Sequence, residues 1–164
     1  MAFAFGGVLA LNRSFALEKE SGCARALMLA PVDRSAIYLG KFTANVIFMF
    51  AIELLVLPLF TIFFDVPVGD AVWMLLLIFF LGAVAFSSVG TLFSAIAANT
   101  RMRELLLPVL LLPVTIPALI AAVETTSWAL GADIDVSFWF KLLIVFDLVF
   151  VTACLMLFEY VLEE

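Results

Sequence analysis

The chain has 164 residues, of which 66% are hydrophobic and 13% are charged, and its formal net charge is −6. A soluble domain is about half apolar and about one quarter charged, so this composition argues against a soluble enzyme. The negative charge leaves no basic surface for nucleic acid. The chain has no His and only two cysteines, Cys23 and Cys154, so we expect neither a metal site nor a disulfide framework.

The apolar residues form one short segment and four long ones. Residues 1–11 are too few to cross a bilayer, which takes roughly 20 helical residues, so we interpret them as part of a truncated first span. None of the long segments alternates with the period of a strand, and backbone groups in lipid must bond internally, so each should be a helix. The sequence predicts an all-α integral membrane protein, a polytopic helical bundle in a single domain. Its expected full spans are residues 42–64, 71–98, 105–123 and 138–160.

The positive charges predict how the chain lies in the membrane, because Lys and Arg are retained on the cytoplasmic side. Seven of the 8 basic residues fall within residues 12–41 and 99–104, which an alternating topology places on the same side. The loops at 65–70 and 124–137 contain acidic residues and no basic ones. Lys141, the remaining basic residue, is near an interface that its long side chain can reach. We therefore expect residues 12–41, residues 99–104 and the C-terminus in the cytoplasm.

Residues 12–41 form the most informative segment, because charged residues there alternate with short apolar runs. Gly22 allows a break after the first helix, and Pro31 ends the short helix predicted for residues 23–30. Asp33 or Ser35 can cap the helix that follows. A short helix along the membrane surface would suit the transfer of motion from a cytoplasmic partner. Interfacial helices that have no such partner are also common.

This segment resembles the haem exporter B family, the CcmB permeases of cytochrome c maturation. The resemblance rests on the runs NRSF, EKESG, LMLAPVDR and AIYLGK within residues 12–41. It continues in VGTLFSAIA at residues 89–97, in the charged residues of 100–104, and in the prolines of the fourth segment. Parts of this pattern are shared with the wider ABC-2 type exporters, whereas PVDR together with the proline-rich segment is more specific. Family members carry a longer N-terminal region than this chain.

The resemblance implies a permease subunit of ABC-2 exporter type in the bacterial cytoplasmic (inner) membrane. Its partner would be a separate CcmA-like ABC ATPase, whose ATP hydrolysis helps to release a haem-loaded chaperone. Other cytochrome c maturation membrane proteins would join the complex, with the permease as a homodimer or in a hetero-oligomer. Haem would be a transported or handled ligand. The residues implied to couple to the ATPase are Glu18, Glu20, Gly22, Arg25, Leu27, Pro31, Asp33 and Arg34.

The residues themselves agree with a permease that has no motor of its own. A phosphate-binding GxxxxGK[ST] loop is absent, since Gly40 and Lys41 lack both the upstream Gly and the following Ser or Thr. ATP would therefore be bound by the partner subunit. The lack of His removes the commonest haem ligand, and no nucleophile with a neighbouring base appears. We predict that the chain is not an enzyme and binds no resident cofactor.

Two patterns within the spans predict how the helices pack. Pro113 and Pro117 should kink the fourth segment, either as a gate or as a bend that neighbouring helices accommodate. The third segment carries small residues at four-residue spacing, which favours close helix packing over a polar pathway. These small residues are Ala83, Ser87, Thr91 and Ala95, with Gly90 beside them.

Two carboxyl groups, those of Glu53 and Asp147, fall near the middle of spans. A charge at this depth costs about 2.5–3.5 kcal/mol on insertion scales, so such residues usually face the protein interior. Proton movement and a polar contact with another subunit are functional interpretations. A protonated carboxyl that forms a hydrogen bond across helices is the structural one. The residues alone leave the choice open.

Two further functions stay open beside the cytochrome interpretation. One is an ABC-2 type exporter permease for another substrate, such as a glycan, a lipid or a drug. The other is a membrane assembly scaffold that anchors the ATPase and transports nothing. ATPase activity that depends on a substrate would separate transport from scaffolding.

Overall fold

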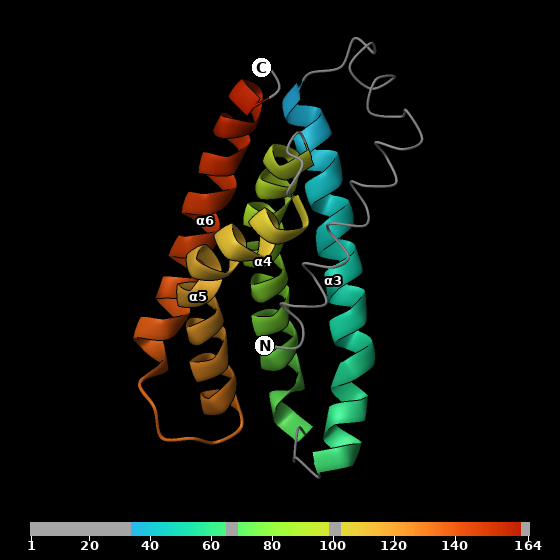
Figure 1. Cartoon of the computed structure of the whole chain (residues 1–164). Coiled ribbons are helices and arrows are strands. Elements are labelled where there is room, and N and C mark those ends of the chain that lie inside the picture. Colours follow the sequence, from blue (N-terminus) through green and yellow to red (C-terminus); the bar gives the residue numbers. More distant parts are fainter. Residues whose placement is uncertain (1–33, 65–68, 99–102, 162–164) are drawn as a thin grey trace.

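The computed structural model of the chain describes residues 34–64, 69–98 and 103–161 (Figure 1). These residues form the long helices α3 (Arg34–Phe64), α4 (Val72–Ala98), α5 (Arg103–Ala129) and α6 (Val136–Val161), with the 3-10 turn η1 (Gly69–Ala71) before α4. No strand occurs in this part of the chain. The apolar segment 1–11 and the short helix expected within residues 23–30 fall outside the described residues.

Each long helix contains a stretch that is long and apolar enough to cross a membrane. These stretches are Ala36–Phe63, Val72–Ile96, Val109–Ala129 and Val136–Phe158. Their large exposed side chains would contact lipid, as for Phe63, which is 81% exposed, and Ile47, which is 63% exposed. The prediction of an all-α membrane bundle is thereby confirmed, and the chain is a multi-pass membrane protein.

Helices α3 and α5 extend well beyond the apolar segments that predicted them. Helix α3 begins at Arg34, before the span expected from residue 42, and its first turns place Tyr38 in the core. Helix α5 continues to Ala129, beyond residue 123. Its last turns contain Thr125, Thr126 and Ser127, whose hydroxyls donate to carbonyls four residues earlier in the same helix. Polar residues can therefore continue a helix after the apolar run has ended.

Helix α4 is central, because its packing against the other three long helices is the most extensive in the described bundle. Figure 1 shows α3 on one side of α4 and α6 on the other. In an apolar window of 18 residues within each membrane-crossing stretch, 44% of the residues of α4 are buried, against 17% for α3 and for α6. In lipid, helix association depends on close packing and hydrogen bonds. The main core cluster draws on all four helices: Met49, Ala83, Ala85, Phe86, Val89, Leu111, Ala118, Ala121, Leu143 and Phe146.

A short turn at residues 130–135 reverses the chain between α5 and α6. Gly131 has a φ of 97°, a left-handed conformation that glycine adopts without a steric penalty. Its N–H donates to the carbonyl of Trp128, and the N–H of Ala132 donates to that of Ser127, which is the Schellman pattern of a helix end. Asp135 then caps α6 by accepting a bond of 3.1 Å from the N–H of Ser137. This turn sets α5 and α6 antiparallel.

Helix α5 changes direction along its length, as Figure 1 shows. Pro113 and Pro117 both lie inside this helix. A proline removes the hydrogen bond to the carbonyl four residues earlier, which favours a bend at that position. Both side chains are exposed on the surface of the described bundle, so neither belongs to its core. A gating role for this bend stays a prediction.

Candidate functional site

The segment predicted to receive motion from an ATPase lies almost wholly outside the described residues. Arg34 is the first residue of α3, and nothing further is described of its side chain. The other members of the predicted set lie outside the described part of the chain: Glu18, Glu20, Gly22, Arg25, Leu27, Pro31 and Asp33. The candidate site that the structure describes is therefore within the membrane-crossing helices.

The small residues of α4 form a buried face of that helix. Ala83, Ser87 and Thr91 are fully buried, Gly90 is buried, and Ala95 is half-buried. The hydroxyl of Thr91 donates to the carbonyl of Ser87 over 2.7 Å, so part of the polarity of this face is satisfied within the helix. The Oγ atom of Ser87 has no hydrogen-bond partner. This face lets the backbones of neighbouring helices come close to α4.

Hydrogen bonds between α3 and α4 join the two helices along the first half of α3. The hydroxyl of Tyr38 donates to the backbone carbonyl of Ser88 over 3.2 Å. The side-chain amide of Asn45 donates to the hydroxyl of Thr91 over 2.9 Å. The Tyr38 ring also packs against Phe158 of α6, with 5.2 Å between the ring centroids. We call this region the Tyr38 end of the α3–α4 interface.

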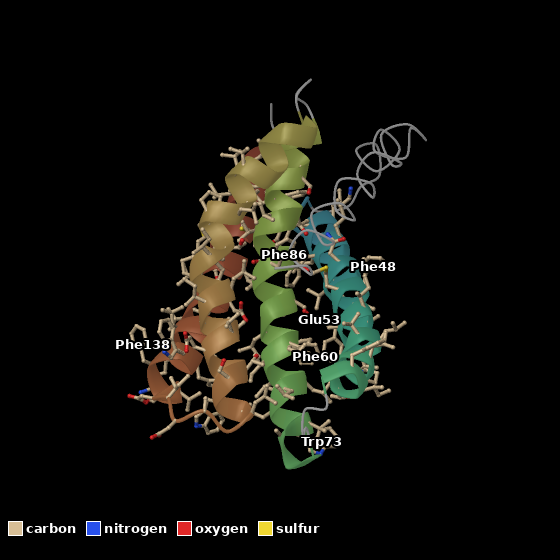
Figure 2. The ribbon with its side chains drawn as sticks, turned by 60° about the horizontal axis from the view of Figure 1, so that its bottom comes forward. Phe48, Glu53, Phe60, Trp73, Phe86 and Phe138 are labelled. Carbon is tan, nitrogen blue, oxygen red and sulfur yellow. The ribbon has the colours of Figure 1, made fainter. Side chains whose placement is uncertain are left out.

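Farther along α3 the same interface opens into a partly enclosed cavity of about 410 Å³. Its walls come from α3, α4 and α5 and are mostly apolar. Glu53 of α3 lines the cavity, is only 8% exposed, and has an Oε2 atom without any hydrogen-bond partner. Figure 2 shows Glu53 between α3 and α4, at a level between Phe86 and Phe60. We call this region the Glu53 cavity.

The other polar side chains among the described residues that line the Glu53 cavity end in hydroxyls, and each hydroxyl already donates a hydrogen bond to a backbone carbonyl. Thr61 donates to the carbonyl of Pro58 over 2.8 Å. Thr126 and Ser127 donate to the carbonyls of Ala122 and Val123 over 2.7 and 2.9 Å. A hydroxyl that donates in this way still has lone pairs with which it can accept. The polar side-chain groups of the cavity wall therefore present acceptors.

Asp147, the second carboxyl within a span, lies elsewhere in the bundle. It is half-buried on α6, its Oδ1 atom has no hydrogen-bond partner, and it lines a shallow surface depression with Leu81 of α4 and Thr152 of α6. None of the residues that line this depression also lines the Glu53 cavity. The structure thus places the two predicted intramembrane carboxyls at separate sites of the described bundle, and a proton role for either one stays a prediction.

The described residues offer little to a metal ion. No three side chains of the types His, Cys, Asp and Glu within the described ranges are grouped so that they could hold one. Cys154 is a free, buried thiol in the cluster with Tyr38, Leu92 and Phe158. Cys23 lies outside the described residues.

Sequence reasoning missed the roles of Tyr38 and Asn45 at the α3–α4 interface. Both belong to the first half of α3, where they looked like residues of a cytoplasmic segment or of the first turns of a span. A signal was present, because a buried Tyr needs a partner for its hydroxyl and an Asn within a span commonly bonds across helices. The acceptors, however, are a backbone carbonyl and a hydroxyl of another helix, and only the fold identifies them.

Comparison with known proteins places this bundle in a family. The chain matches the sequence model described as "CcmB protein" over residues 1–161. It is 33% identical over 117 residues to Heme exporter protein B of Rhodobacter capsulatus, a match that covers 71% of this chain and 53% of that protein. It is 32% identical over 127 residues to Heme exporter protein B of Paracoccus denitrificans, covering 77% of this chain and 58% of that protein.

The chain thus spans little more than half the length of these curated relatives. No solved structure matches it. The family match nevertheless extends over nearly every residue of the chain, including the described helices and the segment before them. This chain belongs to the CcmB protein family.

Proposed function

We propose that this chain is the permease subunit of an ABC transporter that acts in haem export for cytochrome c maturation. The observation that carries the proposal is the match to the CcmB family over residues 1–161. The two relatives named heme exporters agree with it. The chain would lie in the cytoplasmic membrane of a bacterium, as its family implies, and its basic residues would set its orientation there.

The permease would be driven by a separate ATPase subunit, because the sequence contains no phosphate-binding loop of its own. Residues 12–41 would dock on that ATPase and pass its motion into the membrane through α3, whose first residue, Arg34, lies within this segment. Helix α4 would then distribute the motion, since it packs against α3, α5 and α6. ATP hydrolysis would promote release of the haem-loaded chaperone to the cytochromes.

Co-purification with the candidate ATPase tests the coupling role. The wild-type chain is compared with a Glu18→Ala, Glu20→Ala, Arg25→Ala triple variant. This variant removes two negative charges and one positive charge, and Asp133→Ala is a control with the same net change in the turn between α5 and α6. We expect the wild type and the control to retain the ATPase and the triple variant to lose it. Equal retention by all three would contradict docking through this segment.

A second measurement distinguishes docking of the ATPase from coupling of its ATP hydrolysis to release of the chaperone. ATP hydrolysis by the partner is followed in nanodiscs that contain the wild-type chain or the control, with and without the haem-loaded chaperone. We expect hydrolysis to rise when the chaperone is added and chaperone release to require ATP. If the rate of ATP hydrolysis does not change when the chaperone is added, although the ATPase stays bound, the result would favour a scaffold that only anchors the ATPase.

A further inference from the structure

The Glu53 cavity has the features of a binding site that the proposed coupling role does not use. It lies between α3, α4 and α5, the described residues that line it all follow residue 41, and it has a volume of about 410 Å³. The wall is apolar apart from one carboxyl and a few hydroxyls, which is the usual make-up of a pocket for a small molecule. The carboxyl belongs to Glu53, which is more than nine-tenths buried and has an Oε2 atom without a partner.

The polar groups of the cavity determine which ligand would complement it. Each hydroxyl in the cavity wall donates to a backbone carbonyl of its own helix, so its oxygen can only accept further hydrogen bonds. These hydroxyls belong to Thr61, Thr126 and Ser127. No Lys, Arg, Asn, Gln or Trp is among the residues that line the described cavity. A ligand with hydrogen-bond donors and a positive charge would find acceptors throughout. A ligand with carboxylates or phosphates would find no cationic side chain among the described lining residues, and its one side-chain donor would be the proton of the Glu53 carboxyl.

We propose that the Glu53 cavity binds a lipophilic ammonium ion, with its apolar part between α3, α4 and α5 and its ammonium group on the Glu53 carboxyl. An ion pair in a low-dielectric site is favourable when both members gain hydrogen bonds, and here the carboxyl lacks a protein partner. The apolar walls then take up a chain that would otherwise lie in the bilayer. Binding needs neither the ATPase nor ATP, so it can be tested apart from the coupling role.

The charge of the site distinguishes this ligand from two others. Haem carries two carboxylates, which the acceptors of the cavity would repel, so the haem handling proposed above would use another surface. Phosphatidylethanolamine has an ammonium group, but its phosphate is close to that group and would also lie among acceptors. The proposal therefore commits to a single-chain amine without phosphate, for which dodecylamine is a suitable probe.

Modification by dicyclohexylcarbodiimide gives a residue-specific test. This apolar reagent adds to a carboxylic acid: the acid proton moves to one nitrogen, the carboxyl oxygen bonds to the central carbon, and the acyl group then migrates to nitrogen as a stable acylurea. No group leaves, and no oxidant is consumed. An unpaired carboxyl in apolar surroundings retains its proton, so Glu53 should react in the empty cavity. Asp147 is an internal control, because it lies outside the cavity.

The experiment uses the full chain in phosphatidylcholine nanodiscs, with peptide mass spectrometry to follow each carboxyl separately. We expect dodecylamine to protect Glu53 in a saturable way and to leave Asp147 unprotected. Dodecanol, dodecanoate, haem and added phosphatidylethanolamine should give no saturable protection of Glu53. Equal protection by dodecanoate or haem would overturn the charge argument. A Glu53 that stays unlabelled while isotope-labelled dodecylamine shows no saturable binding would show that the cavity is closed or filled by another part of the chain.

Two variants test the site without relying on the reagent. Glu53→Gln keeps the shape of the side chain and removes the charge, so saturable binding of labelled dodecylamine should weaken roughly tenfold or more. Gly82→Leu should abolish binding, because Gly82 lines the cavity and has nothing within 4 Å of an added Cβ. Gly40→Leu is the matched control, since Gly40 on α3 also has open space but lies outside the cavity. Unchanged binding in the first two variants would refute the site.

Discussion

At the Tyr38 end, α3 and α4 are joined by side-chain hydrogen bonds of 3.2 and 2.9 Å. At the Glu53 cavity the same two helices stand apart around about 410 Å³ of space. The side chains that α4 presents differ between these two regions. Ser88 and Thr91 of α4 accept the hydrogen bonds from α3 near Tyr38, whereas the cavity wall includes the larger Ile78 and Phe79. In lipid, small residues and interhelical hydrogen bonds decide where backbones approach each other.

Removing the Tyr38 side chain should have the largest effect on this comparison. Tyr38 is fully buried and contacts both α4 and α6, so Tyr38→Ala leaves a cavity and should lower the free energy of unfolding by about 3–5 kcal/mol. Reversible unfolding in mixed micelles measures this change. Phe63→Ala, at a position that is 81% exposed, is the control and should change stability by less than about 0.5 kcal/mol. Similar losses of unfolding free energy in both variants would contradict the close packing of Tyr38 against α4 and α6.

Enlarging two neighbouring residues of α4 should have opposite results. Ala83 is 0% exposed within the core, so Ala83→Leu forces its neighbours apart and should cost about 1–3 kcal/mol. Gly82 faces the cavity with open space around it, so Gly82→Leu should not destabilise the protein and can gain up to about 1 kcal/mol of helix propensity. The same unfolding assay measures both. Equal destabilisation would mean that the cavity is filled.

Breaking the Asn45–Thr91 hydrogen bond should have a smaller effect. A double-mutant cycle with Asn45→Ala and Thr91→Val isolates the interaction between the two side chains. Such bonds between membrane helices average about 0.6 kcal/mol, and we expect a coupling energy near that value. Additive single effects, with no coupling energy, would show that packing alone closes this end.

Replacing Glu53 should have the smallest effect on stability. Its Oε2 atom makes no hydrogen bond in the described structure, so Glu53→Gln removes no such partner and should change the free energy of unfolding by less than about 0.5 kcal/mol. A loss above about 1.5 kcal/mol would point to a structural role for this carboxyl. A near-neutral result together with altered ligand binding would support a site in the Glu53 cavity.

The composition and apolar segments predicted the all-α membrane fold well. A run of about 20 apolar residues has few alternatives to a helix in lipid, so each of the four expected spans has its helix. The helix ends were less predictable. Helix α5 extends beyond residue 123, where hydroxyls such as that of Thr125 bond to carbonyls of their own helix, and a count of apolar residues does not predict this extension.

The candidate site was predictable only in part. Glu53 and Asp147 could be selected from sequence because a carboxyl within a span is rare. That they occupy separate sites depends on which face of α4 each helix covers, and no pattern within one helix reports this. Ala83 and Thr91 are indeed buried, as four-residue spacing of small side chains would suggest. Their roles, and those of the residues before α3, stay predictions.

The most direct test of the central claim is the formation of c-type cytochrome in cells. A strain that lacks its own CcmB-type permease receives the full chain together with the cognate ATPase, and covalently attached haem is measured on a reporter cytochrome. We predict attached haem with the wild-type chain and with Asp133→Ala, and its loss with the Glu18→Ala, Glu20→Ala, Arg25→Ala variant at equal membrane abundance. No attached haem with a membrane-inserted wild-type chain, or the same yield from the triple variant, would contradict the account.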